Sequence, residues 1–133
     1  MARSAHTLSF EDDYLDIDHW SHRWGVNAGD VRTGQRLLDV FKPFLFALLE
    51  QRLSRKTLLQ HRDNVCALGE HIVHRARQQS QLRRRLIQPV LLAFLDDDGG
   101  PLIYSPASSP AQRAFDSTCI KLRRFLLDSS RPS

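Results

Sequence analysis

Histidines recur at a short spacing in this 133-residue chain, and that spacing is one that zinc sites use. His71 and His74 are three residues apart, and His19 and His22 repeat the interval. Two histidines on one helix face can bind zinc, but the remaining ligands must come from elsewhere in the fold. The chain has no Cys-x-x-Cys pair to supply them. The sequence therefore predicts no metal site and no cofactor.

Carboxylates also cluster, and a calcium loop or an acid–base centre are the chemistries to weigh. The run Asp96–Asp98 precedes Gly99 and Gly100, but it lacks the ligand spacing and the distal glutamate of a calcium loop. We interpret it as a solvated turn. A second acidic group consists of Asp12, Asp13, Asp16 and Asp18. Nothing in the sequence places these aspartates in a pocket with a metal or a base.

Nucleophilic catalysis is not favoured either. Cys66 and Cys119 both lie in apolar helical patterns, where a buried thiol is usually inert. No glycine-rich phosphate loop follows a strand, and strand patterns are nearly absent. No stretch approaches the roughly 20 apolar residues of a membrane span. We expect a cytoplasmic protein that is not an enzyme.

The apolar periodicity predicts an all-α fold, a small bundle of four to five helices. The clearest helix opens at Ser54 as N-cap and buries one stripe: Leu58, His61, Val65, Leu68 and Ile72. Gly69 weakens this helix unless a neighbour approaches closely there. The other expected helices cover 33–51, kinked or broken at Pro43, then 82–95 with an interruption or a fresh start at Pro89, and 109–127.

The chain divides into three parts by composition. Residues 1–29 form an acidic–aromatic extension, residues 30–128 the helical domain, and residues 129–133 a frayed tail. The extension holds both tryptophans, so we expect its aromatic residues to dock on the core. A sharper hypothesis is that this acidic strap lies over the basic region and screens it from a polyanion.

The net charge of +4 and the pI of about 9.6 permit nucleic-acid binding without requiring it. The segment 52–85 contains nine lysines and arginines but only two acidic residues, Asp63 and Glu70. Arg55 and Lys56 occupy a first helical turn, where they either assist anion binding or merely solubilise the helix. Two helix faces offer phosphate-binding and base-reading side chains: Lys56 and Gln60 on one, and Arg113, Ser117, Lys121 and Arg124 on the other.

One set of positions also resembles a known pattern: Phe41, Phe44–Leu45, Leu48–Leu49, Leu53–Ser54, Thr57–Leu58, His61, Val65, Leu68 and Ile72. It resembles the N-terminal core-binding (SAM-like) domain of tyrosine recombinases and phage integrases, over about 36–72 and loosely over 109–127. The resemblance implies a helical clamp on DNA. It implies these DNA-facing residues: Arg55, Lys56, Gln60, Arg113, Ser117, Lys121 and Arg124.

The chain departs from that family in two respects. Nothing supplies the family's arginine–histidine–arginine–tyrosine set, and Tyr104 lacks those companions, so no nucleophile is carried over. The extension before Asp30 is not part of the family's pattern. A module of this kind either assists DNA binding or has lost it.

We therefore expect a non-catalytic DNA-binding or recombination-accessory module whose partner is double-stranded DNA. The alternative is a protein–protein interaction adaptor, or a homo-oligomer, that uses Ile120, Leu127 or the N-terminal aromatic residues as its contact surface. Neither hypothesis involves a membrane or a small-molecule substrate.

Overall fold

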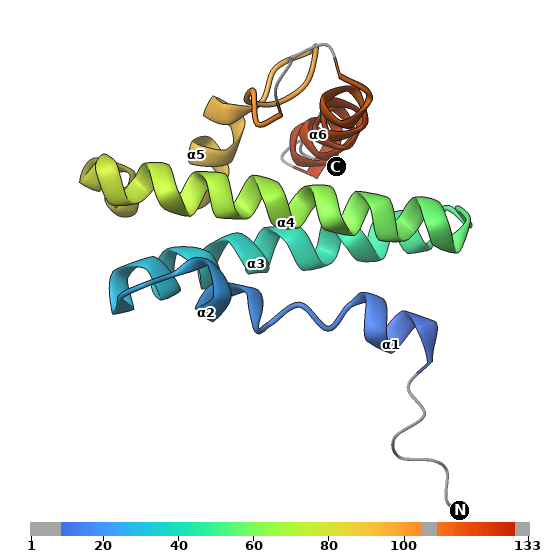
Figure 1. The fold of residues 1–133 in the computed structure, drawn as a ribbon, viewed down its shortest axis with the longest axis horizontal. Helices are drawn as coiled ribbons and strands as arrows, with labels where there is room; N and C mark the ends of the chain where they lie inside the picture. Colours follow the sequence, from blue (N-terminus) through green and yellow to red (C-terminus); the bar gives the residue numbers. More distant parts are fainter. Residues whose placement is uncertain (1–8, 105–108, 130–133) are drawn as a thin grey trace, which may run out of the picture.

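The computed structural model describes residues 9–104 and 109–129, which form an all-α bundle with no strand in those ranges (Figure 1). The predicted fold class is confirmed. The elements run in order as α1 (Phe10–Tyr14), α2 (Trp20–Trp24), α3 (Ala28–Leu49), α4 (Arg55–Gln78), the 3-10 helix η1 (Ser80–Arg84), α5 (Ile87–Phe94) and α6 (Pro110–Ser129).

The long helices α3 and α4 lie side by side across the middle of the molecule (Figure 1). Their link is short and turns at Arg52, whose φ of 61° is the left-handed conformation. So short a link makes the two helices antiparallel neighbours. Their facing sides bury the largest part of the core, including Leu37, Phe41, Leu45, Val65, Leu68 and Ile72.

Helix α3 differs from its prediction in two ways. It begins at Ala28 rather than about Thr33, because the Asn27 side chain accepts a hydrogen bond from the Asp30 N–H and caps it. It also continues through Pro43 without a break. Pro43 has no N–H, so the carbonyl of Asp39, four residues earlier, lacks its usual donor. Both residues are exposed, so water can satisfy that carbonyl.

The segment before α3 packs along the bundle on the side opposite α5 and α6 (Figure 1). Tyr14, Trp20 and Trp24 are almost fully buried, which confirms that the aromatic residues dock on the core. Trp24 lies against α4 at Gly69, where an added methyl group would overlap the indole ring. The close neighbour expected at this glycine is therefore Trp24, and residues 10–24 share one core with α3 and α4.

The stretch predicted over 82–95 forms two elements, η1 and α5, and the break falls at Arg85 and Leu86 rather than at Pro89. Pro89 lies in the first turn of α5, where a missing N–H costs no intrahelical hydrogen bond. Helix α6 opens at Ser109, whose Oγ accepts from the Gln112 N–H at 3.1 Å. None of the described helices combines the length and the apolarity that crossing a bilayer requires.

Candidate nucleic-acid interface

Helix α6 is anchored by its buried side, which leaves one polar face toward solvent. Gln112 is fully buried and ties down the preceding loop, because its Oε1 accepts from the N–H groups of Ile103 and Tyr104 at 3.0 and 2.9 Å. Its Nε2 donates to the Pro101 carbonyl at 3.0 Å. Phe115 fills the core beneath. These contacts fix the rotation of α6 about its own axis.

A polar joint then fixes α6 against α4. His61 Nδ1 lies 2.7 Å from Thr118 Oγ1, and the Asn64 amide donates to that hydroxyl at 2.9 Å and to the Ala114 carbonyl at 3.2 Å. Burial lowers the pKa of His61, and the ammonium of Lys121 lowers it further. The imidazole is therefore neutral at physiological pH, and Lys121 lies close to the joint.

The outer face of α6 lines an open groove of about 380 Å³. The helical spacing brings together the four predicted residues of this helix: Arg113, Ser117, Lys121 and Arg124. Ile120, expected as a partner contact, lies in the same groove and is half-buried, whereas Leu127 lies outside it and is 36% exposed.

Two carboxylates also line this groove, Asp98 and Asp116. Asp116 is turned toward the protein, since its Oδ1 accepts from Gln112 Nε2 at 2.9 Å and from the Gly100 N–H at 3.2 Å. Lys121 and Arg124 form no ion pair within residues 9–104 and 109–129. Neither charge is therefore held in an ion pair, although Asp98 shares this groove and Asp128 lines a neighbouring hollow with both cations.

The three candidates on α4 lie outside the lining of that groove. Arg55 packs on the extension instead, with its guanidinium carbon 5.0 Å from the centre of the Phe10 ring. Lys56 and Gln60 are exposed on the solvent side of α4. The predicted surface is thus concentrated on α6, with Lys56 and Gln60 as separate exposed positions.

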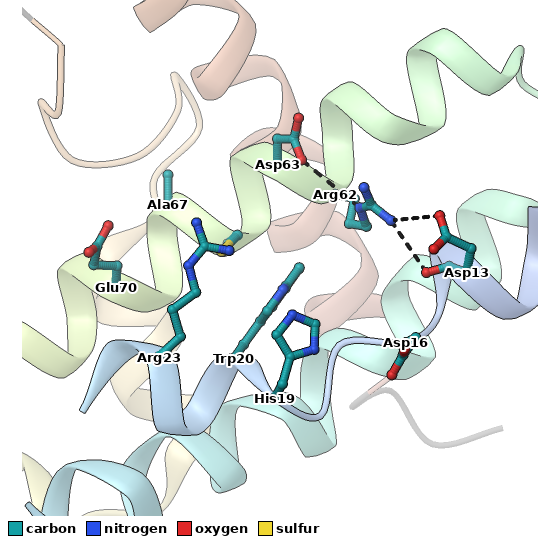
Figure 2. Close-up of a pocket in the computed structure, with 10 residues that line it drawn as sticks. Asp13, Asp16, His19, Trp20, Arg23, Arg62, Asp63, Ala67 and Glu70 are labelled. Carbon is teal, nitrogen blue, oxygen red and sulfur yellow. Dashed lines mark hydrogen bonds and ion pairs between the residues drawn. The ribbon is translucent and has the colours of Figure 1, made fainter. Parts of the chain in front are cut away.

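A second cavity, of about 560 Å³, lies between the extension and α4 (Figure 2). Asp13, Asp16, Asp63 and Glu70 line it, so two of the aspartates that the sequence left without a pocket do have one. Arg62 lies among them, with Nη1 3.4 Å from the Asp13 carbonyl and Nε 3.9 Å from Asp63 Oδ1.

Acidic and basic side chains line this cavity together, and only Arg62, Asp13 and Asp63 among them form ion pairs in the described ranges. Arg23 rises from α2 toward α4, and His19 lies beside Trp20 on the extension (Figure 2). Burial raises the pKa of the Cys66 thiol, which keeps it protonated at neutral pH. No nucleophile paired with a base results from this arrangement.

The acidic extension does not cover the α6 groove. Two of its described carboxylates form ion pairs with other cations, Asp13 with Arg62 at 3.7 Å and Asp18 with Lys42 at 2.7 Å. The screening hypothesis concerned the basic region 52–85. There the extension does meet two cations, Arg62 through Asp13 and Arg55 through Phe10, but it leaves α6 uncovered. The deletion that would test this hypothesis removes Trp20 and Trp24 from the core, so loss of folding would obscure the result.

Sequence reasoning missed an arginine cluster where α4 ends. Asp30 is only 1% exposed and accepts from Arg77 Nε at 3.0 Å and from Arg83 Nη2 at 2.9 Å. Burial alone would raise the pKa of Asp30, but the Val26 N–H and these two guanidinium groups hold it below its usual range. The only signal in the sequence was the run of three arginines at 83–85.

Metal ligation finds no geometric support in the part of the chain that the structure describes, where no three histidine, cysteine or carboxylate side chains gather suitably. His71 instead packs edge-on against Phe94, with ring centres 5.7 Å apart, and His74 lies 3.3 Å from the Gln78 amide. Comparison with protein-family models, curated proteins and solved structures finds no match to this chain.

Proposed function

We propose that this protein is a non-catalytic module that binds double-stranded DNA through the outer face of α6. The observation that carries the proposal is the pair Lys121 and Arg124, which share one groove and form no ion pair within the described ranges. Arginine and lysine supply most phosphate contacts in protein–DNA complexes, and serine hydroxyls add hydrogen bonds. Ser117 lies in the same groove.

The groove geometry suits phosphates better than bases. The α6 side chains that line it are three cations, Ser117, Ile120 and Asp116, whose Oδ1 accepts from Gln112 Nε2. The cations can contact phosphates or a guanine edge, but no amide is present there to read adenine. Gln60, which has such an amide, is exposed on α4 and lies outside the groove. We therefore expect α6 to contribute mainly contacts to the DNA backbone.

The surroundings of Cys119 and of the two tyrosines support a role without covalent chemistry. Burial raises the pKa of Cys119 to about 12, so its thiolate is scarce at neutral pH. Burial also raises the pKa of Tyr14, whose hydroxyl donates to the Leu45 carbonyl at 3.0 Å. Tyr104 packs against Phe115 with ring centres 6.2 Å apart.

The test is a gel-shift titration of labelled duplex DNA at low salt with the Lys121→Glu/Arg124→Glu variant. Losing two phosphate contacts and gaining two repulsive charges should weaken binding by roughly a hundredfold or more. Arg113 is left unchanged because it makes a further interaction of its own. Lys121→Arg/Arg124→Lys keeps the charges and should bind like the unmodified chain.

A second control reverses one charge away from α6, at Arg23, which lines the cavity beside the extension. Arg23→Glu should leave the affinity within about threefold, since the expected loss from a single remote charge is small after screening. Equal weakening by Arg23→Glu and by the α6 variant would contradict a specific role for α6.

The alternative is a protein-interaction adaptor on the same fold, and Ile120 is the observation that favours it. This side chain is half-buried in the α6 groove, so a partner would cover it together with the cations. Binding to such a partner would survive high salt, whereas phosphate binding weakens steeply. Undetectable duplex binding at low salt would favour the adaptor.

A further inference from the structure

Side chains of α3 hold the short segment that follows α4. Arg83 reaches back to Asp30 on α3, with its Nη2 2.9 Å from Oδ1. Arg36, also on α3, donates through Nη1 to the Arg83 carbonyl at 2.9 Å and through Nη2 to the Arg85 carbonyl. Side chains of α3 therefore fix both the side chain and the backbone of this short segment.

The last three residues of that segment are exposed to solvent. Arg84 and Arg85 are exposed and form no ion pair within residues 9–104 and 109–129. Leu86 is 78% exposed, although leucine is usually buried. We name Arg84, Arg85 and Leu86 the arginine tip. Fold stability explains Arg36, Arg77 and Arg83, but it does not explain the arginine tip.

The surroundings of the tip are strongly cationic. Arg77 and Arg83 share a single carboxylate, that of Asp30, so the local charge is positive before Arg84 and Arg85 are counted. The C-terminal end of α4 accommodates nearby cations because of the helix dipole. The helix dipole is already matched by Arg77 and Arg83. It does not account for an exposed leucine next to further arginines.

We propose that the arginine tip enters the minor groove of duplex DNA, with Arg84 and Arg85 in the groove and Leu86 against its wall. This inference rests on the proposed function and adds a second DNA-binding element to the one on α6. A narrow A·T minor groove has an enhanced negative potential that attracts arginine. Apolar side chains that wedge against base steps accompany such arginines in minor-groove binders.

The contacts that hold the backbone of the arginine tip suit it to binding in a groove. A loop that is already ordered loses little conformational entropy on binding, so its contacts contribute more fully to affinity. The Arg36 hydrogen bonds and the Arg83–Asp30 ion pair supply that order before DNA is present.

An anionic membrane surface is a weaker fit. The apolar part of the tip is one leucine, and Val26, whose N–H donates to Asp30, adds one more exposed side chain at this end. Membrane binding of surface segments scales with the apolar area they bury, and even a single myristoyl chain binds only marginally. A narrow groove needs only one wedge.

The experiment measures binding of the full chain to two labelled duplexes of equal length, one with a central A·T tract and one of G·C pairs only. The unmodified chain should prefer the A·T duplex. Arg84→Gln and Arg85→Gln should each weaken A·T binding about tenfold, and each should reduce the salt slope by about 0.9, because one phosphate charge is no longer neutralised. The double variant should lose the A·T preference.

Matched controls separate the tip from general effects of charge and apolar surface. Arg23→Gln removes one exposed charge elsewhere and should leave the A·T preference intact. Leu86→Ala should weaken A·T binding, whereas Leu102→Ala, which removes a leucine that is 72% exposed, should not. Circular dichroism of each variant establishes that the helical fold is retained.

The outcomes are distinct. Loss of DNA binding in Lys121→Glu/Arg124→Glu, with the A·T preference unchanged in the Arg84/Arg85 double variant, would overturn the tip and spare the proposed function. No binding of either duplex by the unmodified chain would overturn both. Binding to phosphatidylserine vesicles that Leu86→Ala abolishes, with DNA affinity unaffected, would assign the tip to a lipid surface instead.

Discussion

The two sides of the bundle both carry cations, but they use them differently. On the side covered by residues 9–25, Arg62 pairs with Asp13, Lys42 pairs with Asp18, and Arg55 packs on Phe10. Arg23 is the exception on this side, since it is exposed and forms no ion pair in the described ranges. On the side formed by α6, Arg123 pairs with Asp97 at 2.6 Å, but Lys121 and Arg124 line an open groove and form no ion pair in the described ranges. A count of basic residues cannot distinguish these two sides.

The difference separates cations that hold the fold from cations that an external anion can reach. The arginine cluster at the end of α4 shows both kinds within a few residues. Arg83 is held by the buried Asp30, whereas Arg84 and Arg85 are exposed. Removing a held cation should lower stability, and removing an exposed one should lower affinity while stability is kept.

The largest effect on stability is expected where the extension enters the core. Trp24→Ala should cost about 3–5 kcal/mol of unfolding free energy, because it empties the space beside Gly69 and removes the edge-on packing against Phe41. Urea unfolding followed by circular dichroism measures it, with Val26→Ala as the exposed control. A loss below about 1 kcal/mol would mean that the extension is not part of the core.

A smaller loss is expected at the buried carboxylate. Asp30→Asn should cost about 2–3 kcal/mol at pH 7, because Arg77 and Arg83 lose their charged acceptor. Asp39→Asn, on the exposed side of the same helix, should be nearly neutral.

The effect at Asp30 has a defined pH dependence. The pKa of Asp30 is lower in the folded protein than in the unfolded chain, so its stabilisation is present above about pH 4 and is lost as the pH falls through the folded value. The Asn variant should therefore approach the unmodified chain in acid. A difference that stays constant from pH 7 to the acid transition would contradict a stabilising role for the charge.

The smallest effect concerns the joint between α4 and α6. The pKa of His61 is lower in the folded state, so the unfolded chain binds its proton more readily, and stability falls as the pH drops below about 6.5. His61→Gln should reduce that slope without abolishing it, because burial lowers the pKa of His71 as well. Thermal unfolding at several pH values measures it, with the exposed His22→Gln as control, and an unchanged slope would contradict the assignment.

Local signals were sufficient for most helices. Ser54 and Ser109 mark the starts of α4 and α6 because an N-cap requires only a side chain and the next turn. The early start of α3 was also encoded locally, since Asn27 precedes Asp30 by three residues, but the preceding aromatic segment hid the helical period. The spacing of Arg113, Ser117, Lys121 and Arg124 likewise predicts a shared face, which the structure shows as one groove.

Contacts between distant parts of the chain were not predictable from these signals. Asp30 and Arg83 are 53 residues apart, and the sequence holds no mark that pairs them. The same limit applies to Arg55, whose partner Phe10 lies on the extension. Which cations are held and which are available depends on tertiary packing, so the division could be drawn only from the structure.

The salt dependence of duplex binding by the unmodified chain tests the central claim most directly. If Arg113, Lys121 and Arg124 meet phosphates, the logarithm of the binding constant should fall against the logarithm of salt concentration with a slope of about −2.7 or steeper. Binding that is unaffected by salt, or no binding at the lowest salt concentration, would contradict the account.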